Sequence, residues 1–214
     1  MSHARDEYQH HEHQHHEHSE NDEHRHHEHE HVDYGDAVRS FRADKDAFFR
    51  TNTHSPLPAA EREGFEGLQY FPVDEALRFE GLTLAPYSGS EPTSFEIPTS
   101  DGRLRPAERA GSLRFKVEGT ACSLTAYTFE GGSVESVFVP FLDATSGVES
   151  YGAGRYLDIK REDDGTYVID FNLAYHPSCV YDTRFSCPLT PAENRLPVRI
   201  EAGERLTPHL PPRP

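Results

Sequence analysis

The residues best suited to chemistry lie together near the carboxyl end of the sequence. His176, Cys179 and Cys187 fall in one stretch that Pro177 and Pro188 exclude from regular helix or central strand. The three side chains suit either a catalytic cysteine–histidine pair or three ligands of a metal site. No oxyanion or base-orienting motif surrounds either cysteine, and no fourth metal ligand is evident. We favour a structural loop, tied down through backbone hydrogen bonds by Tyr175, Tyr181 and Asn194.

A second group of polar side chains falls on a predicted β-hairpin directly before this loop. Alternating apolar residues flank Asp163-Asp164-Gly165, a sequence typical of a three-residue turn with a left-handed glycine. In that register Leu157 faces Phe171 on one side, and Asp158 faces Asp170 on the other. Facing carboxylates either line a cavity and hold a cation or lie on a solvated surface. The sequence leaves both alternatives open.

The hairpin and the loop together predict a small-ligand pocket. Two glycines in Tyr151-Gly152-Ala153-Gly154 allow positive φ or close approach to a ligand. The arginine that follows them is able to grip a carboxylate or phosphate, or to pair with an acid of its own domain. We expect the pocket to be lined by Tyr151, Arg155, Asn172, Tyr175 and His176. No residue is assigned a catalytic role.

The amino-terminal segment carries a separate chemistry, that of a metal-binding tail. Residues 1–31 hold 12 of the 15 histidines and nine acids. Imidazoles at His-x-His and His-His spacing suit Zn²⁺ or Ni²⁺. The run 10–31 has nothing apolar to bury, so residues 1–32 are expected to be disordered. The alternatives are a cloning tag and a solubilising, pH-responsive tail. The expected ligands are His10, His11, His13, His15, His16, His18, His24, His26, His27, His29 and His31.

The rest of the sequence predicts one β-rich domain over residues 33–214. Residues 33–52 have helical periodicity, with a cap at Asp33 or Asp36. The apolar residues on or near one face of this helix are Val38, Phe41, Phe48 and Phe49. About eight short β-prone runs follow, separated by turn residues and without intervening helices. The pattern predicts a mainly β fold, an antiparallel barrel or strongly curved sheet with a long N-terminal helix.

The composition restricts the partners and the compartment. The 214 residues carry a formal net charge of -16, and the part after residue 31 still has 28 acids and 19 bases. This sign argues against nucleic acid and anionic membranes as partners. There is no apolar run of membrane-spanning length, and the amino terminus lacks the hydrophobic centre of a signal peptide. We therefore expect a soluble, cytoplasmic, acidic protein whose cysteines are too few for a disulfide framework.

Several motifs in a fixed order carry a family resemblance. The segments FRADKDAFF, SPL, GLQYFP, FLDATSG, YGAGRYLDI, DFNLAYHPSCVYDTRFSCPL and PAENRLPVRIEAGE span about residues 38–204. Together they resemble an uncharacterised prokaryotic family, domain of unknown function 1684, and the His-rich tail lies outside the resemblance. The family implies no activity, and its pattern includes the pair Cys179 and Cys187. It often has asparagine at the position of His176, which argues against an obligatory role for that side chain.

The sequence thus predicts an uncharacterised, non-enzymatic module that binds a small molecule, with a tail that binds transition metals. One alternative is a hydrolase-type enzyme that uses Asp158 and Asp170, or His176, as acid, base or metal ligand. Another is a metal-handling protein whose tail carries the metal while the β-domain docks a partner.

Overall fold

The computed structural model describes residues 33–206. The chain divides into two units, Met1–His31 and Val32–Pro214, and the described residues belong to the second. The predicted disorder and the predicted metal ligands of residues 1–32 lie outside the described residues.

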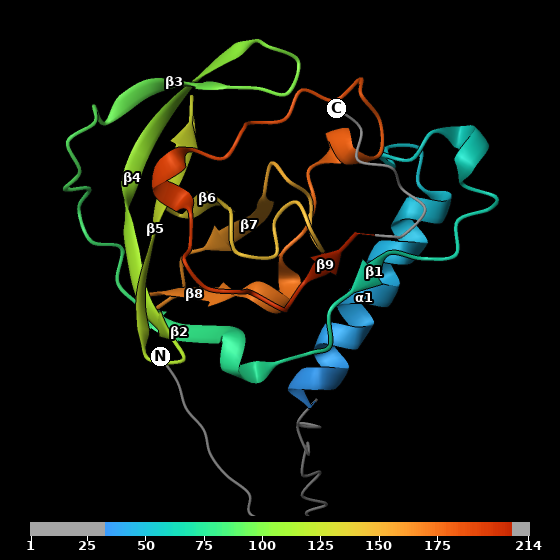
Figure 1. Cartoon of the computed structure of the whole chain (residues 1–214), viewed down its shortest axis with the longest axis horizontal. Helices are drawn as coiled ribbons and strands as arrows, with labels where there is room; N and C mark the ends of the chain where they lie inside the picture. Colours follow the sequence, from blue (N-terminus) through green and yellow to red (C-terminus); the bar gives the residue numbers. More distant parts are fainter. Residues whose placement is uncertain (1–32, 207–214) are drawn as a thin grey trace, which may run out of the picture. The chain divides into compact units, whose positions relative to one another are not determined.

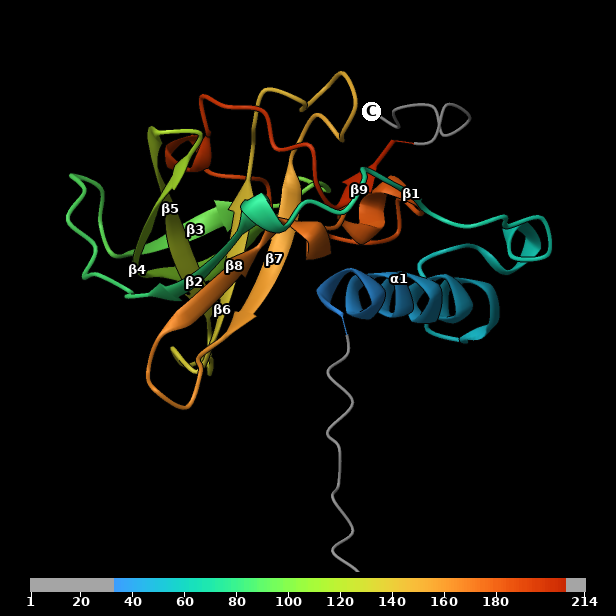
Figure 2. The same cartoon turned by 90° about the horizontal axis from the view of Figure 1, so that it is seen from below.

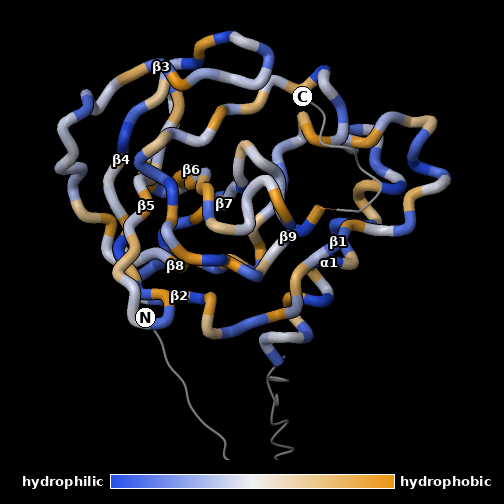
Figure 3. Tube along the Cα trace, in the orientation of Figure 1, coloured by the Kyte–Doolittle hydropathy of each residue, from blue (hydrophilic) through white to orange (hydrophobic). Residues whose placement is uncertain are grey.

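The predicted N-terminal helix is present as α1, Tyr34–Thr51. The carboxylate of Asp33 caps it by accepting the N–H of Asp36, as its position predicted. It is the one α-helix among residues 33–206. Its bounds lie within one residue of the predicted range 33–52, but at 18 residues it is short, so its description as a long helix is wrong. Figure 3 shows hydrophilic and hydrophobic positions alternating along α1.

The buried side of α1 differs from the predicted apolar face. Val38 and Phe49 are buried, but Phe41 and Phe48 are 43% and 39% exposed. The positions between Val38 and Phe49 on the buried side belong to Arg42, Lys45 and Asp46, all half-buried. Spacings of three and four residues place these charged side chains on the same helix face as the two apolar ones. The buried face of α1 therefore carries charged side chains where the sequence pattern predicted apolar ones.

Nine strands of residues 33–206 form three antiparallel sheets (Figure 1). They are β1 (Gln69–Tyr70), β2 (Arg78–Leu82), β3 (Ser94–Pro98), β4 (Leu104–Val117), β5 (Thr120–Phe129), β6 (Ser136–Phe141), β7 (Arg155–Lys160), β8 (Tyr167–Asp170) and β9 (Glu204–Arg205). The largest sheet has the order β3-β4-β5-β6-β7, while β2 pairs with β8 and β1 with β9. Its end strands β3 and β7 do not pair, so the barrel that we predicted is not closed within the described residues.

Short 3₁₀ turns lie in the connections between these elements. They are η1 (Ala59–Glu61), η2 (Glu75–Leu77), η3 (Phe171–Leu173), η4 (Ser178–Val180) and η5 (Ala192–Asn194). Three of them carry buried polar or thiol side chains: Asn172 in η3, Cys179 in η4 and Asn194 in η5.

The predicted hairpin after β7 is confirmed only at its tip. The N–H of Glu162 donates to the carbonyl of Thr166 at 2.9 Å, and Gly165 has φ 86°, as the three-residue turn requires. Beyond the tip the strands separate, because β7 pairs with β6 and β8 pairs with β2. Figure 2 shows β8 beside β2. The predicted pairings of Leu157 with Phe171 and of Asp158 with Asp170 are wrong.

The strands separate because both carry apolar residues into one core. Leu157 and Ile159 of β7 and Ile169 of β8 belong to the same buried cluster, which β2 and η3 also cover. Two sheets that face each other bury more apolar surface than one continuous hairpin, which would leave one of its faces uncovered. A second, smaller cluster joins α1 to the loops around it and comprises Phe49, Leu57, Leu68, Val180 and Tyr181.

Within the described part of the chain, no helix has the length and apolar character needed to cross a membrane.

Candidate functional site

The structure does not gather the five predicted pocket residues around one cavity. Two of them, Arg155 and Asn172, are buried and hydrogen-bonded to the protein itself. His176 is also buried, and only Tyr151 and Tyr175 are half-exposed. The five residues therefore do not form a single site.

Arg155 holds the C-terminal segment against β7. Its side chain is 0% exposed, and its guanidinium donates to the carbonyl oxygens of Ile200 at 2.7 Å, Ala202, and Glu204 at 3.2 Å. It also lies 3.3 Å from a carboxylate oxygen of Asp143, which is itself fully buried. Burial lowers the pKa of Arg155, and the Asp143 charge opposes that shift. Pairing with an acid of its own domain, one of the two predicted roles, is confirmed.

Asn172 joins β8 to the segment before β2. Its amide oxygen accepts the N–H of Asp74 at 2.9 Å, and its amide nitrogen donates to the Asp74 carbonyl at 2.8 Å. The hydroxyl of Tyr34, in the first turn of α1, donates to both carboxylate oxygens of Asp170 at 2.9 Å. Burial, followed by the Asp170 carboxylate, raises the pKa of Tyr34. Asn172 and Asp170 therefore connect buried elements and do not line an open pocket.

A buried carboxylate, Glu204 of β9, lies at the centre of the remaining predicted residues. It accepts the N–H of His176 at 2.7 Å and the hydroxyl of Tyr181 at 3.0 Å, and Lys45 Nζ lies 2.6 Å from its other oxygen. The ring Nε2 of His176 accepts the N–H of Tyr151 at 3.3 Å. Burial lowers the pKa of His176 to about 4, although Glu204 opposes this shift. Burial raises the pKa of Glu204, but Lys45 and His176 hold it below its ordinary value.

The Glu204 cluster consists of Glu204, Lys45, His176 and Tyr181, and its contacts are internal. Burial keeps His176 neutral at pH 7. Its Nε2 accepts a backbone N–H, and its Nδ1 faces Glu204 at 3.6 Å, so both ring nitrogens point toward protein groups. Lys45 keeps 19% of its side chain exposed and lies over the Tyr175 ring at 4.6 Å. The sequence patterns did not point to Lys45 or Glu204. The helical spacing of Lys45 from Val38 and Phe49 could have shown that Lys45 lies on the buried face of α1.

The predicted structural loop is confirmed by its contacts. Tyr175 exchanges backbone hydrogen bonds with Tyr156 of β7, at 2.8 and 3.1 Å. The Asn194 amide, 0% exposed, donates to the carbonyls of Thr125 and Pro140 at 2.8 and 2.7 Å and accepts the Thr125 N–H at 2.8 Å. Its side chain therefore bridges β5 and β6, where the two strands no longer hydrogen-bond to each other.

The chemistry predicted for paired acids and for metal ligands has no geometric support. Asp158 is exposed on one side of β7 and accepts the Tyr175 hydroxyl at 2.5 Å, whereas Asp170 is buried beside α1. In residues 33–206, no group of three or more His, Cys, Asp or Glu side chains is arranged to hold a metal ion. The hypothetical ligand set of His176, Cys179 and Cys187 is thus not formed. The tail histidines lie outside the described residues.

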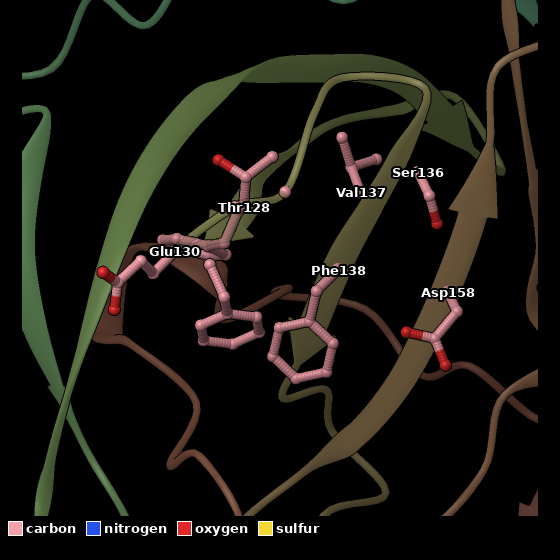
Figure 4. Close-up of a pocket in the computed structure, with 10 residues that line it drawn as sticks. Thr128, Glu130, Ser136, Val137, Phe138 and Asp158 are labelled. Atoms are coloured by element: carbon pink, nitrogen blue, oxygen red, sulfur yellow. The ribbon is translucent and has the colours of Figure 1, made fainter.

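An open hollow lies on the side of the large sheet away from the main core. This outer-face hollow has a volume of about 380 Å³ and is lined by residues 127–132, residues 136–138 and Asp158. Phe138 occupies an outward position between Val137 and Val139, which face the core. Figure 4 shows Phe138 near the middle of the hollow, with Glu130 and Asp158 on opposite sides.

Four aromatic rings form a row across this face of the sheet. The Phe129 and Phe138 centroids are 5.4 Å apart, Phe138 and Tyr156 are 4.7 Å apart, and Tyr156 and Tyr175 are 5.8 Å apart. The guanidinium of Arg105 lies over Phe129 at 3.8 Å, so this ring already accepts a cation on one face. Tyr175 is the one predicted pocket residue that belongs to the row.

The lining of the outer-face hollow is aromatic and acidic. Glu130 and Asp158 supply carboxylates, and Thr128 and Ser136 supply hydroxyls. None of the ten lining residues is lysine, arginine or histidine. Phe138 faces Asp158 directly across β6 and β7. The arrangement can place a positive charge against the Phe138 ring and balance it with carboxylates. The sequence patterns did not point to Phe129 or Phe138. The position of Phe138 between Val137 and Val139 on a strand could have shown that its ring faces outward.

Comparisons with known proteins place the chain in a family. The sequence profile described as "Protein of unknown function (DUF1684)" matches residues 63–205. The chain is similar to a solution NMR structure of an uncharacterized protein of Haloarcula marismortui, with 37% identity, 81% of this chain and 94% of that chain covered, and a TM-score of 0.61. No curated protein matches the sequence.

Proposed function

Since the chain belongs to the DUF1684 family, whose description assigns no activity, we propose from its own geometry that it is a non-enzymatic module that binds a small organic cation in the outer-face hollow. The observation that carries the proposal is the position of Phe138 between the carboxylates of Glu130 and Asp158 (Figure 4), with its ring centroid 5.4 Å from that of Phe129.

Charge complementarity selects the ligand class. An ammonium group over an aromatic face gains about 0.5 to 2 kcal/mol, and the gain is larger where water is excluded. Two nearby carboxylates add attraction for a cation and repel an anion. The volume of about 380 Å³ suits a small molecule and lies near the lower end of ligand pockets.

The same lining supports binding over catalysis. The ten lining residues include no histidine, cysteine or lysine. One oxygen of Asp158 already accepts the Tyr175 hydroxyl, which fixes the carboxylate beside Phe138. The hydrolase alternative used Asp158 and Asp170, or His176, in a pocket. The two acids lie on different sheets, and His176 is buried with its Nε2 accepting the Tyr151 N–H.

An NMR titration with tetramethylammonium tests the proposal. Neopentyl alcohol, which is neutral and of similar size, is the comparison compound. We expect shift changes in the backbone amides of residues 127–138 with the cation and weaker changes with the neutral compound. Phe138→Ala removes one ring face worth about 1 kcal/mol and should weaken binding about fivefold. Asp158→Asn should weaken it in the same direction.

Phe41→Ala is the matched control, because Phe41 is an exposed aromatic residue on α1 outside the hollow. It should leave binding unchanged. Equal binding of the cation and the neutral compound, or an unaltered affinity in both hollow variants, would refute the proposal.

Metal binding by the tail is a separate proposal. It rests on the histidine spacing of residues 1–32 and on the preference of Zn²⁺ and Ni²⁺ for imidazole. A metal-handling role would follow from this tail and not from the outer-face hollow, so the two proposals can fail independently.

A further inference from the structure

Two cysteines that the outer-face hollow does not use lie against each other. Cys179 is in η4 and Cys187 lies beyond the exposed loop residues 183–185. The backbone N–H of Cys179 donates to Sγ of Cys187 with an N to Sγ distance of 3.3 Å. Both thiols are free, with 9% and 8% of the residue surface exposed.

The backbone around both cysteines is fixed, so their proximity does not depend on a mobile loop. Ser100 donates its N–H to the Cys187 carbonyl at 2.8 Å, and its hydroxyl accepts the Cys187 N–H at 3.0 Å. On the other side, the N–H of Val180 donates to the Pro177 carbonyl at 3.0 Å. Since the Cys179 nitrogen is one bond from its Cα, Sγ of Cys187 lies within reach of the Cys179 side chain.

We propose that Cys179 and Cys187 form a redox-active dithiol that closes to a disulfide by exchange with a small-molecule disulfide such as oxidised glutathione. Cys179, as thiolate, attacks one sulfur of that disulfide and releases one small thiolate, which leaves a mixed disulfide on Cys179. Cys187 then loses its proton and attacks Sγ of Cys179, and the second small thiolate leaves. The two cysteines are oxidised by two electrons, and the small disulfide is reduced to two thiols.

The surroundings of the two thiols assign their order of reaction. Hydrogen bonds from the Cys187 thiol and from the hydroxyls of Ser100 and Tyr151 lower the pKa of Cys179, against the effect of burial. The Cys179 sulfur and burial raise the pKa of Cys187, although the N–H of Cys179 opposes this shift. The two neighbouring hydroxyls therefore make Cys179 the attacking thiolate and Cys187 the resolving thiol.

The third cysteine serves as an internal control. Cys122 lies on β5 inside the main core, where burial raises its pKa, and it has no neighbouring cysteine in the described cluster. It should remain a thiol under conditions that oxidise the other two.

The experiment exposes the reduced full-length chain to oxidised glutathione at pH 7, then alkylates it under denaturing conditions and counts modified cysteines by intact mass and peptide mapping. We expect three alkylated cysteines before oxidation and only Cys122 alkylated afterwards, with a disulfide peptide joining Cys179 and Cys187. Three alkylated cysteines after exposure would overturn the proposal.

Single variants test the order of reaction, with circular dichroism as the check on folding. Cys187→Ser should stop at a stable glutathione adduct on Cys179, and Cys179→Ser should react at least tenfold more slowly at Cys187. Cys122→Ser should oxidise like the unaltered chain. Equal adduct formation in the two pair variants would overturn the assigned roles.

Discussion

Replacing Lys45 by methionine tests whether the Glu204 cluster stabilises the fold. Methionine keeps an unbranched apolar side chain but removes the ammonium group, which lies 2.6 Å from Glu204 and over the Tyr175 ring at 4.6 Å. Glu204, whose side chain is 2% exposed, would then be a buried carboxylate without a cation.

The size of the effect follows from burial and from the remaining hydrogen bonds. Removing one partner of a buried ion pair costs about 3 to 5 kcal/mol. Glu204 would keep the hydrogen bonds from His176 and Tyr181, and Lys45 is 19% exposed in the intact pair. We therefore expect a loss of about 3 kcal/mol in the free energy of unfolding at pH 7.

Urea unfolding measures this loss, and a double-mutant cycle with Glu204→Gln assigns it to the pair. The double variant should be more stable than the sum of the single losses predicts, because it contains no unpaired buried charge. Lys116→Met is the matched control: Lys116 is exposed on β4, and its replacement should change stability by less than about 0.5 kcal/mol. Additive single losses, or a Lys45 effect as small as the Lys116 effect, would refute the assigned role of the pair.

Three further predictions concern pH, the loop and the tail. The pKa of His176 is about 4 in the folded protein and about 6.5 in the unfolded chain, so the unfolded state binds more protons as pH falls from 6.5 to 4. The unaltered chain should therefore lose about 3 kcal/mol of unfolding free energy over this pH range. Urea unfolding at several pH values should show this loss in the unaltered chain and not in His176→Asn. Asn194→Ala leaves the buried backbone groups of Thr125 and Pro140 without hydrogen-bond partners. It should lower the unfolding free energy, measured by urea unfolding, by about 3 kcal/mol. A loss below about 1 kcal/mol would contradict the bridging role of Asn194. Calorimetry should detect Ni²⁺ or Zn²⁺ uptake by the full chain and none after deletion of residues 1–32; unchanged uptake would contradict metal binding by the tail.

The sequence predicted local structure well where one physical rule controlled it. Helical spacing and a capping acid predicted α1 to within one residue at each end. Turn residues between short β-prone runs predicted a mainly β fold, and along β4 the alternating residues Leu113, Phe115 and Val117 are all buried. Both patterns depend on contacts between residues that are close in the sequence, so no knowledge of the sheet order was needed.

The site was harder to predict because polar side chains do not reveal whether they face a ligand or the protein. Arg155 and Asn172 have the chemistry of binding residues, yet distant carbonyls of Ile200 and Asp74 satisfy them. Those partners lie far away along the chain and become neighbours only after the sheets form. A buried polar residue therefore resembles a ligand-binding residue in sequence, and only its hydrogen-bond partners distinguish the two.

The separation of β7 from β8 shows why the outer-face hollow escaped prediction. Had the hairpin stayed paired, Asp158 would face Asp170, and two carboxylates would dominate any site there. Because β7 pairs with β6, Asp158 faces Phe138, and a carboxylate lies beside an aromatic ring. The change of strand partner thus replaces a site suited to a metal cation or acid–base chemistry by one suited to an organic cation. The turn fixed the local register correctly, but the identity of the neighbouring strand decided the chemistry.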